Sequence, residues 1–287
     1  MAGKGQEYWR QPFRKRIRSE AGMQIKLFQA LWGMEGTYSE LMKRAAREGY
    51  AGIEAPLPPL NLEREFKEQL AAHRLSYIAQ IVTSGDHATS FAAQAERAAA
   101  FDPVLIVSHS ARDFMPFWEQ LLFFEGALKV ERSIGITVGH ETHRSRAMFT
   151  PWNTSALLRE LPDLSITADF SHWCCVTETM LEEFEEDLRL AIERTVHIHA
   201  RLGHPEGPQV AHPAAPENKD VLQAFKCWWD AVLAGRERSG AAVATVTPEF
   251  GPVGYMPSLP FTRQPVADLR EVNDWMAGWI RETYPSS

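Results

Sequence analysis

From about residue 24 onward, short runs of apolar and β-branched residues alternate with longer amphipathic stretches. Residues 104–108 (VLIVS) are typical of a buried strand, because the run is short, continuous and apolar. Within 180–194, apolar residues recur at helical spacing, and Thr37 with Glu40 has the pattern of a capping box. The pattern predicts strands at 25–30, 50–54, 76–82, 104–108, 135–140, 164–169, 195–199 and 242–246, and helices at about 37–46, 62–74, 88–100, 113–131, from 151, 180–194, 221–233 and 266–280.

Eight strand–helix units in succession indicate βαβ crossovers and a parallel sheet, and eight such units close naturally into a barrel. The competing α/β architecture is an open doubly wound sheet. That fold favours a glycine fingerprint after an early strand, and the sequence contains neither GxGxxG nor GxxxxGK[ST]. The prediction is therefore an α/β protein with a single (β/α)8 TIM barrel over residues 23–287, its loops elongated after strands seven and eight.

Residues 1–22 differ in character from the rest of the chain. This stretch carries six basic residues against two acidic ones, together with Tyr8, Trp9 and Phe13. We expect a basic N-terminal extension that is partly ordered, since short basic runs are usually solvated arms. Its acidic residues and poor apolar periodicity argue against a targeting peptide.

Composition narrows the function classes. The 287 residues carry a formal net charge of −7, so nucleic acid and anionic membranes are unfavourable partners, and a small molecule is the expected one. No apolar run approaches the roughly 20 residues that span a bilayer. The three cysteines form no CxxC pair, and this usage fits a reducing compartment, so a cytoplasmic location is expected. Nine tryptophans, among them the pair Trp228-Trp229, could supply the contact surface of a homo-oligomer.

Four acidic or imidazole side chains stand at equivalent places, at the ends of strands five to eight. A barrel of this class places its chemistry at the carboxyl ends of its strands. Three carboxylates and one imidazole in one bowl would repel one another without a cation. The oxygen-rich set suits one divalent ion, Mn²⁺ or Mg²⁺ first, with Zn²⁺ or Co²⁺ as alternatives. The residues are Glu141, Asp169, His199 and Glu249.

Other motifs are weaker. The sequence His140-Glu141-Thr142-His143 is not HExxH, because its second histidine comes one residue too early for a shared helix face. No GxSxG elbow is present, and Cys174-Cys175 has no clear base, so nucleophilic catalysis is disfavoured. His109, after strand four, could contact substrate, and His197 is expected to be a buried neighbour of His199. Glu54, at the end of strand two, could brace the barrel mouth.

With these residues, the sequence resembles the xylose-isomerase-like TIM-barrel superfamily, which includes sugar isomerases, sugar epimerases and the related type-IV apurinic endonucleases. The resemblance covers about residues 24–282. The resemblance rests on Tyr50-Ala51-Gly52-Ile53-Glu54, Glu141, Asp169-Phe170-Ser171-His172, His197-Ile198-His199 and Pro248-Glu249.

The resemblance implies one divalent metal held by Glu141, Asp169, His199 and Glu249. It also implies that Glu141 and Glu249 move a proton through a metal-stabilised enediolate. His172 would bind a substrate oxygen, and Arg201 or a nearby loop residue would bind a distal hydroxyl or phosphate. His109 and His143 are further candidates for substrate contact. The sequence departs from many relatives at Ala200-Arg201 and in the loops 142–146 and 205–217, which are expected to shape a specific pocket.

The function expected from these residues is a metal-dependent isomerase or epimerase of a sugar or sugar-like hydroxycarbonyl compound. An alternative is a metal-dependent lyase, hydrolase or apurinic-endonuclease-like phosphodiesterase, with His87, His109, His172 and His212 as extra metal donors. A third possibility is a binding protein on a decayed barrel, since fold alone does not determine function. Metal stoichiometry separates the first two, because the nuclease chemistry uses a cluster of ions.

Overall fold

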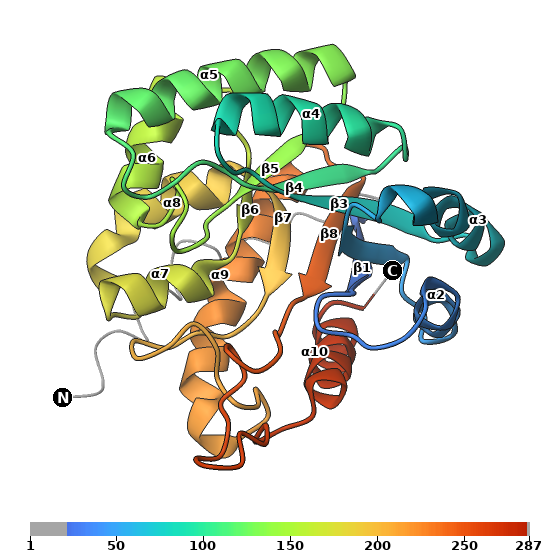
Figure 1. Ribbon diagram of the computed structural model, residues 1–287. Coiled ribbons are helices and arrows are strands. Elements are labelled where there is room, and N and C mark those ends of the chain that lie inside the picture. Colours follow the sequence, from blue (N-terminus) through green and yellow to red (C-terminus); the bar gives the residue numbers. More distant parts are fainter. Residues whose placement is uncertain (1–21, 286–287) are drawn as a thin grey trace.

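The computed structural model describes residues 22–285 and shows a closed barrel of eight parallel strands with the helices outside it (Figure 1). Each strand pairs with its neighbours in chain order, and β1 closes the ring against β8. The predicted TIM barrel is therefore confirmed. The strands are β1 (Gln24–Ala30), β2 (Gly52–Pro56), β3 (Ser76–Val82), β4 (Leu105–His109), β5 (Val138–Glu141), β6 (Ile166–Ala168), β7 (Thr195–Ala200) and β8 (Val243–Pro248). The predicted N-terminal extension falls almost wholly outside the described residues.

The helices follow the strands as the amphipathic stretches predicted, except that the helix Phe170–Thr177 was not predicted. The capping box is present, since Thr37 Oγ1 accepts from the Glu40 N–H and the Glu40 carboxylate accepts from the Thr37 N–H. Among the described residues, no helix is long and apolar enough to cross a membrane. The helices are α2 (Tyr38–Arg47), α3 (Glu63–His73), α4 (His87–Ala99), α5 (Phe117–Ile134), α6 (Pro151–Glu160), α7 (Phe170–Thr177), α8 (Glu185–Glu193), α9 (Lys219–Arg238) and α10 (Leu269–Thr283), with the short 3-10 turns η1 (Leu60–Leu62), η2 (Glu182–Phe184) and η3 (Pro216–Asn218).

Two predicted boundaries are wrong for identifiable reasons. The single helix predicted over 180–194 is interrupted, because Leu181 has a left-handed backbone (φ 66°) and buries its side chain completely. A short turn, η2, therefore precedes α8. The strand predicted from Gly135 begins only at Val138, because Gly135 (φ 70°) is the left-handed cap that ends α5.

The barrel interior is closed below its carboxyl end by a small apolar cluster of Phe28, Ile78, Leu105 and Val107. Successive strand residues alternate between the two faces, so Gln80 and His109 lie on the same face as Ile78 and Val107, nearer the carboxyl end.

Gly52 permits this packing. A Cβ there would lie 2.5 Å from the Phe28 ring and 2.2 Å from the Ser76 carbonyl oxygen. The apolar layer is a floor, and the polar side chains above it face the mouth of the barrel.

The loops after β7 and β8 are long, as expected, and both run over the carboxyl end of the barrel. Gln209, in the first loop, and Gly251, in the second, exchange hydrogen bonds through the Gln209 amide at 2.7 and 3.2 Å. Asn273 of α10 fixes the second loop by bonding both the N–H and the carbonyl of Phe250. These bonds hold the residues that follow β7 and β8 in place.

Candidate metal centre

Four acidic or imidazole side chains converge at the carboxyl end of the barrel. Glu141 ends β5, Asp169 follows β6 as the N-cap of α7, His199 lies in β7, and Glu249 follows β8. Each offers a ligand atom, these atoms all lie within 4.8 Å of one another, and all four residues are buried. The structure thus brings together the four residues that sequence reasoning selected as metal ligands.

The tautomer of His199 shows that this donor set fits a cation. His199 Nε2 lies 2.8 Å from a Glu54 oxygen, and because a carboxylate can only accept, Nε2 carries the proton. In that form Nδ1 is left with a bare lone pair. It faces a Glu249 oxygen at 2.9 Å and a Glu141 oxygen at 3.5 Å, and it has no hydrogen-bond partner among residues 22–285. A lone pair that faces two carboxylates is the arrangement that a divalent ion would stabilise.

Glu54 is held by its own set of partners. Its second oxygen accepts from Thr247 Oγ1 at 2.6 Å and from His197 Nε2 at 3.1 Å. The pKa of Glu54 is lowered although burial alone raises it, because His199 and His197 lie beside it. His197 is therefore the buried neighbour that was expected, and Glu54 does more than brace the mouth, since it orients His199. A carboxylate in this outer position increases the basicity of a metal-binding histidine.

The electrostatics around the cluster are strongly negative. Burial alone lowers the pKa of His199, but Glu249, Glu54 and Glu141 raise it well above its ordinary value. Burial raises the pKa of Asp169 to about 6, with Glu141 and Glu249 adding to the effect and Arg201 opposing it. Without a metal ion, a proton on His199 Nδ1 thus takes the place that the ion would have beside the carboxylates. Metal binding must displace that proton.

We expect metal affinity to fall as the pH falls. Because the pKa of His199 is raised, its Nδ1 competes for a proton at neutral pH, so the apparent metal Kd rises by about tenfold per pH unit below that pKa. Below about pH 6, Asp169 adds a second competing proton and the dependence steepens. Calorimetric titration with Mn²⁺ from pH 5.5 to 8.5, in buffers of different ionisation enthalpy, counts the protons released. A Kd that is constant over this range, with no proton release, contradicts the expectation.

Replacing Glu54 tests its control over His199. In Glu54→Gln, the carboxylate that fixes the Nε2–H tautomer becomes a neutral amide, so we expect metal affinity to fall by about 10- to 100-fold. Titration of the variant with Mn²⁺ measures this, and Glu186→Gln, on the exposed face of α8, is the control. An unchanged Kd in Glu54→Gln would show that Glu54 acts only on the fold.

Arg201 lies inside the cluster. It is buried and donates from Nη2 to Asp169 Oδ2 and, at 2.7 Å, to His172 Nε2, while Nε donates to Ser171 Oγ at 3.1 Å. The other Asp169 oxygen accepts from Ser171. Each carboxylate oxygen has two lone pairs, so Asp169 keeps capacity for a further ligand. The predicted contact of Arg201 with substrate stays a prediction, while its contact with Asp169 is what the structure shows.

The remaining predicted substrate residues border the same cavity or lie against it. His109 Nε2 contacts a Glu141 oxygen, and burial lowers the pKa of His143 to about 3, which keeps that ring neutral. His143 stacks between His109 and His172, with ring centroids 4.6 and 4.0 Å away. His109, Glu141 and His143 form a second group whose donor atoms could hold a cation. Glu141 thus belongs to both groups.

The cavity above the cluster has a volume of about 220 Å³. Sequence reasoning missed four of its lining residues: Trp32, Gln80, Val82 and Tyr255. Gln80 donates to Glu249 Oε1 at 3.3 Å, and its signal was a polar residue inside an apolar strand. Tyr255 shares a hydrogen bond of 3.1 Å with His143 and packs on Arg201 and Trp32. Nothing in the sequence marks that loop tyrosine.

Two of the histidines that were possible extra donors for the nuclease alternative lie elsewhere. His87, at the start of α4, bonds Thr83 Oγ1 at 2.8 Å, and His212 packs its ring against Trp275. Neither belongs to a group of potential metal ligands within residues 22–285.

No protein family and no curated protein sequence matches the chain. Solved structures do. A sugar phosphate isomerase/epimerase from Parabacteroides distasonis has 12% identity and a TM-score of 0.61, with 96% of this chain and 100% of that chain covered. A xylose isomerase-like TIM barrel protein from Mycobacterium smegmatis in complex with magnesium has 9% identity and a TM-score of 0.59, covering 90% and 95%. An AP endonuclease, family 2, from Brucella melitensis has 14% identity and a TM-score of 0.55, covering 88% and 98%. At these identities, the likeness shows that the chain shares the TIM-barrel fold of these proteins.

Proposed function

We propose, from the premise of a xylose isomerase-like barrel, that this protein is a divalent-metal-dependent isomerase or epimerase of a small hydroxycarbonyl compound. The observation that carries the proposal is the position of His199 Nδ1, which faces Glu141 and Glu249 while Glu54 holds a proton on Nε2, so that a second proton or a metal ion is needed between Nδ1 and the carboxylates. Glu141, Asp169, His199 and Glu249 would hold the ion. When bound, the ion supplies Lewis-acid stabilisation of the oxyanion that forms when a proton leaves the carbon next to a carbonyl.

The chain itself supplies the groups that move the proton. A carboxylate within hydrogen-bond reach of that carbon removes the proton, and a second carboxylate returns a proton to the neighbouring carbon or to the opposite face. Glu141 and Glu249 are the two carboxylates that line the cavity. Burial raises the pKa of Glu141, but His109 and His199 outweigh this and keep it ionised, as a base requires. Gln80, bonded to Glu249 Oε1, orients the second carboxylate.

The other cavity residues suit a polyhydroxylated substrate. The neutral imidazole of His143, the amide of Gln80 and the hydroxyl of Tyr255 offer donors and acceptors without net charge. The volume of about 220 Å³ lies below the roughly 300–1,000 Å³ of pockets that hold drug-sized ligands, which favours a compact substrate.

The experiment follows solvent deuterium into the substrate. The metal-loaded protein is incubated in D₂O with a panel of ketoses and aldoses, and NMR detects both the exchanged carbon and any new isomer. Incorporation of deuterium next to the carbonyl, abolished by EDTA and restored by Mn²⁺ or Mg²⁺, supports the proposal. Metal-dependent turnover without carbon exchange would overturn it.

A phosphodiesterase is the second candidate, and the group His109, Glu141 and His143 favours it, since Glu141 could bridge two ions. Against it stand the net charge of −7 and the separation of His87 and His212 from the cluster. Measurement of bound metal decides: about one ion per chain supports the isomerase, whereas two or three with cleavage of an abasic duplex supports the nuclease.

A further inference from the structure

A second and larger cavity, of about 780 Å³, lies beside the metal centre. Its walls come from the end of β3, the start of α4, the loop after β4 and the start of α5, and it also reaches Arg146 in the loop after β5. Val82 lines both this cavity and the smaller one above the metal centre. The hydrogen bonds of Thr83 to the His109 carbonyl tie the two regions together. The proposed function uses none of this space.

Two arginines enter this cavity without a counter-ion. Arg146 is anchored by its Nη1, which donates to the carbonyls of Thr83 and Ala111 at 3.1 and 3.4 Å. The Arg112 guanidinium lies 5.3 Å from the ring centroid of Phe114. Within residues 22–285, neither guanidinium lies within 4.0 Å of a carboxylate oxygen. Burial and the neighbouring Arg112 charge lower the pKa of Arg146, and the Glu141 and Asp113 charges only partly oppose this.

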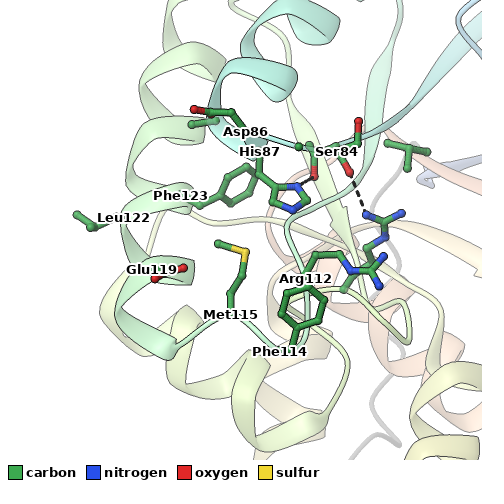
Figure 2. Close-up of a pocket in the computed structure, with 14 residues that line it drawn as sticks. Ser84, Asp86, His87, Arg112, Phe114, Met115, Glu119, Leu122 and Phe123 are labelled. Atoms are coloured by element: carbon green, nitrogen blue, oxygen red, sulfur yellow. Dashed lines mark hydrogen bonds between the residues drawn. The ribbon is translucent and has the colours of Figure 1, made fainter.

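Neither carboxylate that lines the cavity, Asp86 or Glu119, forms an ion pair with these arginines within residues 22–285. Asp86 caps α4 by accepting from the Thr89 N–H at 3.0 Å. Glu119 lies across the hollow from Arg112, with Met115 on its own side (Figure 2). Among residues 22–285, no carboxylate thus forms an ion pair with the two half-buried guanidinium groups on this wall. An oxyanion fits there, because the planar guanidinium fork binds carboxylate and phosphate oxygens in pairs.

His87 adds a neutral acceptor beside these cations. Thr83 Oγ1 donates to the His109 carbonyl, so the bond of 2.8 Å to His87 uses a proton on His87 Nδ1 and leaves Nε2 bare. Burial, with Arg146 and Arg112, lowers the pKa of His87. Phe123 and Met115 cover the adjoining side of the hollow (Figure 2). The lining therefore offers cationic donors, an acceptor for a hydroxyl, and an apolar surface for carbon.

We propose that this cavity is a subsite for a terminal oxyanion of the substrate, a phosphate or a carboxylate, bound by Arg112 and Arg146 while the hydroxycarbonyl end lies at the metal centre. The inference rests on the proposed function for the reacting end of the substrate. Its own evidence is the pair of arginines that form no ion pair within residues 22–285, and Val82, which lines both cavities. The substrate class narrows accordingly, from neutral sugars to sugar phosphates or sugar acids.

Ion binding tests the subsite without reference to turnover. Inorganic phosphate is titrated into the full-length protein, both in EDTA and loaded with Mg²⁺, with ³¹P NMR as the readout; acetate is titrated separately. We expect one of the two to bind in EDTA, and Arg112→Gln to weaken it by about tenfold or more. Arg64→Gln, on the exposed surface of α3, is the matched control and leaves binding unchanged. Equal binding by Arg112→Gln and wild type, or no binding of either ion, overturns the subsite.

Activity measurements separate the oxyanion subsite from the proposed isomerase or epimerase function. A neutral ketose, its phosphate ester and the matching sugar acid are compared as substrates, and we expect Arg112→Gln to lower the ratio of anionic to neutral kcat/KM by about tenfold or more. The better anionic substrate identifies phosphate or carboxylate as the group. A ratio that Arg112→Gln does not change overturns the subsite. If no compound shows metal-dependent turnover, the proposed function fails while the ion titrations still decide the subsite.

Discussion

Glu249→Gln is expected to lower kcat/KM by about a thousandfold while the protein stays folded, since positioned acids and bases contribute roughly 10²–10⁴-fold. Gln has the same shape as Glu, and Glu249 is buried with Gln80 3.3 Å from one oxygen and His199 Nδ1 2.9 Å from the other. The amide can still accept a hydrogen bond, but it can neither remove a proton from carbon nor bind a cation as a carboxylate does. The loss therefore falls on chemistry rather than on folding.

Three measurements on Glu249→Gln separate these effects. Turnover of the substrate found in the D₂O screen gives kcat/KM, thermal unfolding reports the fold, and metal analysis reports occupancy. Glu186→Gln, on the exposed face of α8, is the matched control. A Glu249→Gln variant that retains its metal and more than a tenth of wild-type activity would show that Glu249 is not the acid or base.

Arg201→Met is expected to lower the free energy of unfolding by about 3–5 kcal/mol in EDTA at pH 7.5, because removing one partner leaves the other charge buried alone. Arg201 is buried, and its guanidinium contacts Asp169 while bonding His172 and Ser171. Methionine keeps much of the volume but none of the charge. Asp169 would then be a buried carboxylate near Glu141 and Glu249, with only the His199 imidazolium left to oppose their charges.

The loss of unfolding free energy in Arg201→Met is expected to depend on pH in a definite direction. The pKa of Asp169 is already about 6 with Arg201 opposing the rise, so it rises further in Arg201→Met. A carboxyl group with a folded-state pKa above its unfolded value destabilises the fold as the pH rises through that folded pKa. The deficit relative to wild type should therefore shrink as the pH falls toward 5.5, and saturating Mn²⁺ should also reduce it, since an ion that binds only the folded state stabilises it.

Urea unfolding of both proteins at pH 5.5, 6.5 and 7.5, with and without Mn²⁺, measures these changes. Arg64→Met, which removes an exposed pair with Glu68, is the control and should cost less than about 1 kcal/mol. If Arg201→Met is as stable as the control at pH 7.5, Arg201 does not neutralise Asp169 in the folded protein.

The alternation of short apolar runs and amphipathic stretches was enough to predict the barrel, because each strand–helix unit has its own local period. The same logic selected Glu141, Asp169, His199 and Glu249, since parallel strands in a closed barrel end at one rim. Leu181 shows where local pattern fails. Its apolar side chain suits a helix face, yet the core takes that side chain from a left-handed backbone that interrupts the helix.

Contacts between distant strands were decided only by the tertiary structure. Glu54 and His199 are 145 positions apart, and the bond that sets the tautomer of His199 exists only once the barrel has closed. The path of a loop brings Tyr255 to the cavity above the metal centre, and strand register brings Gln80 there. Arg112 and Arg146 come from two different loops and line the larger cavity together. Residue type and spacing along the chain thus determined the fold and the set of candidate ligands. The protonation, pairing and electrostatic neighbours of those residues depend on through-space distances of a few ångströms, which no local pattern encodes.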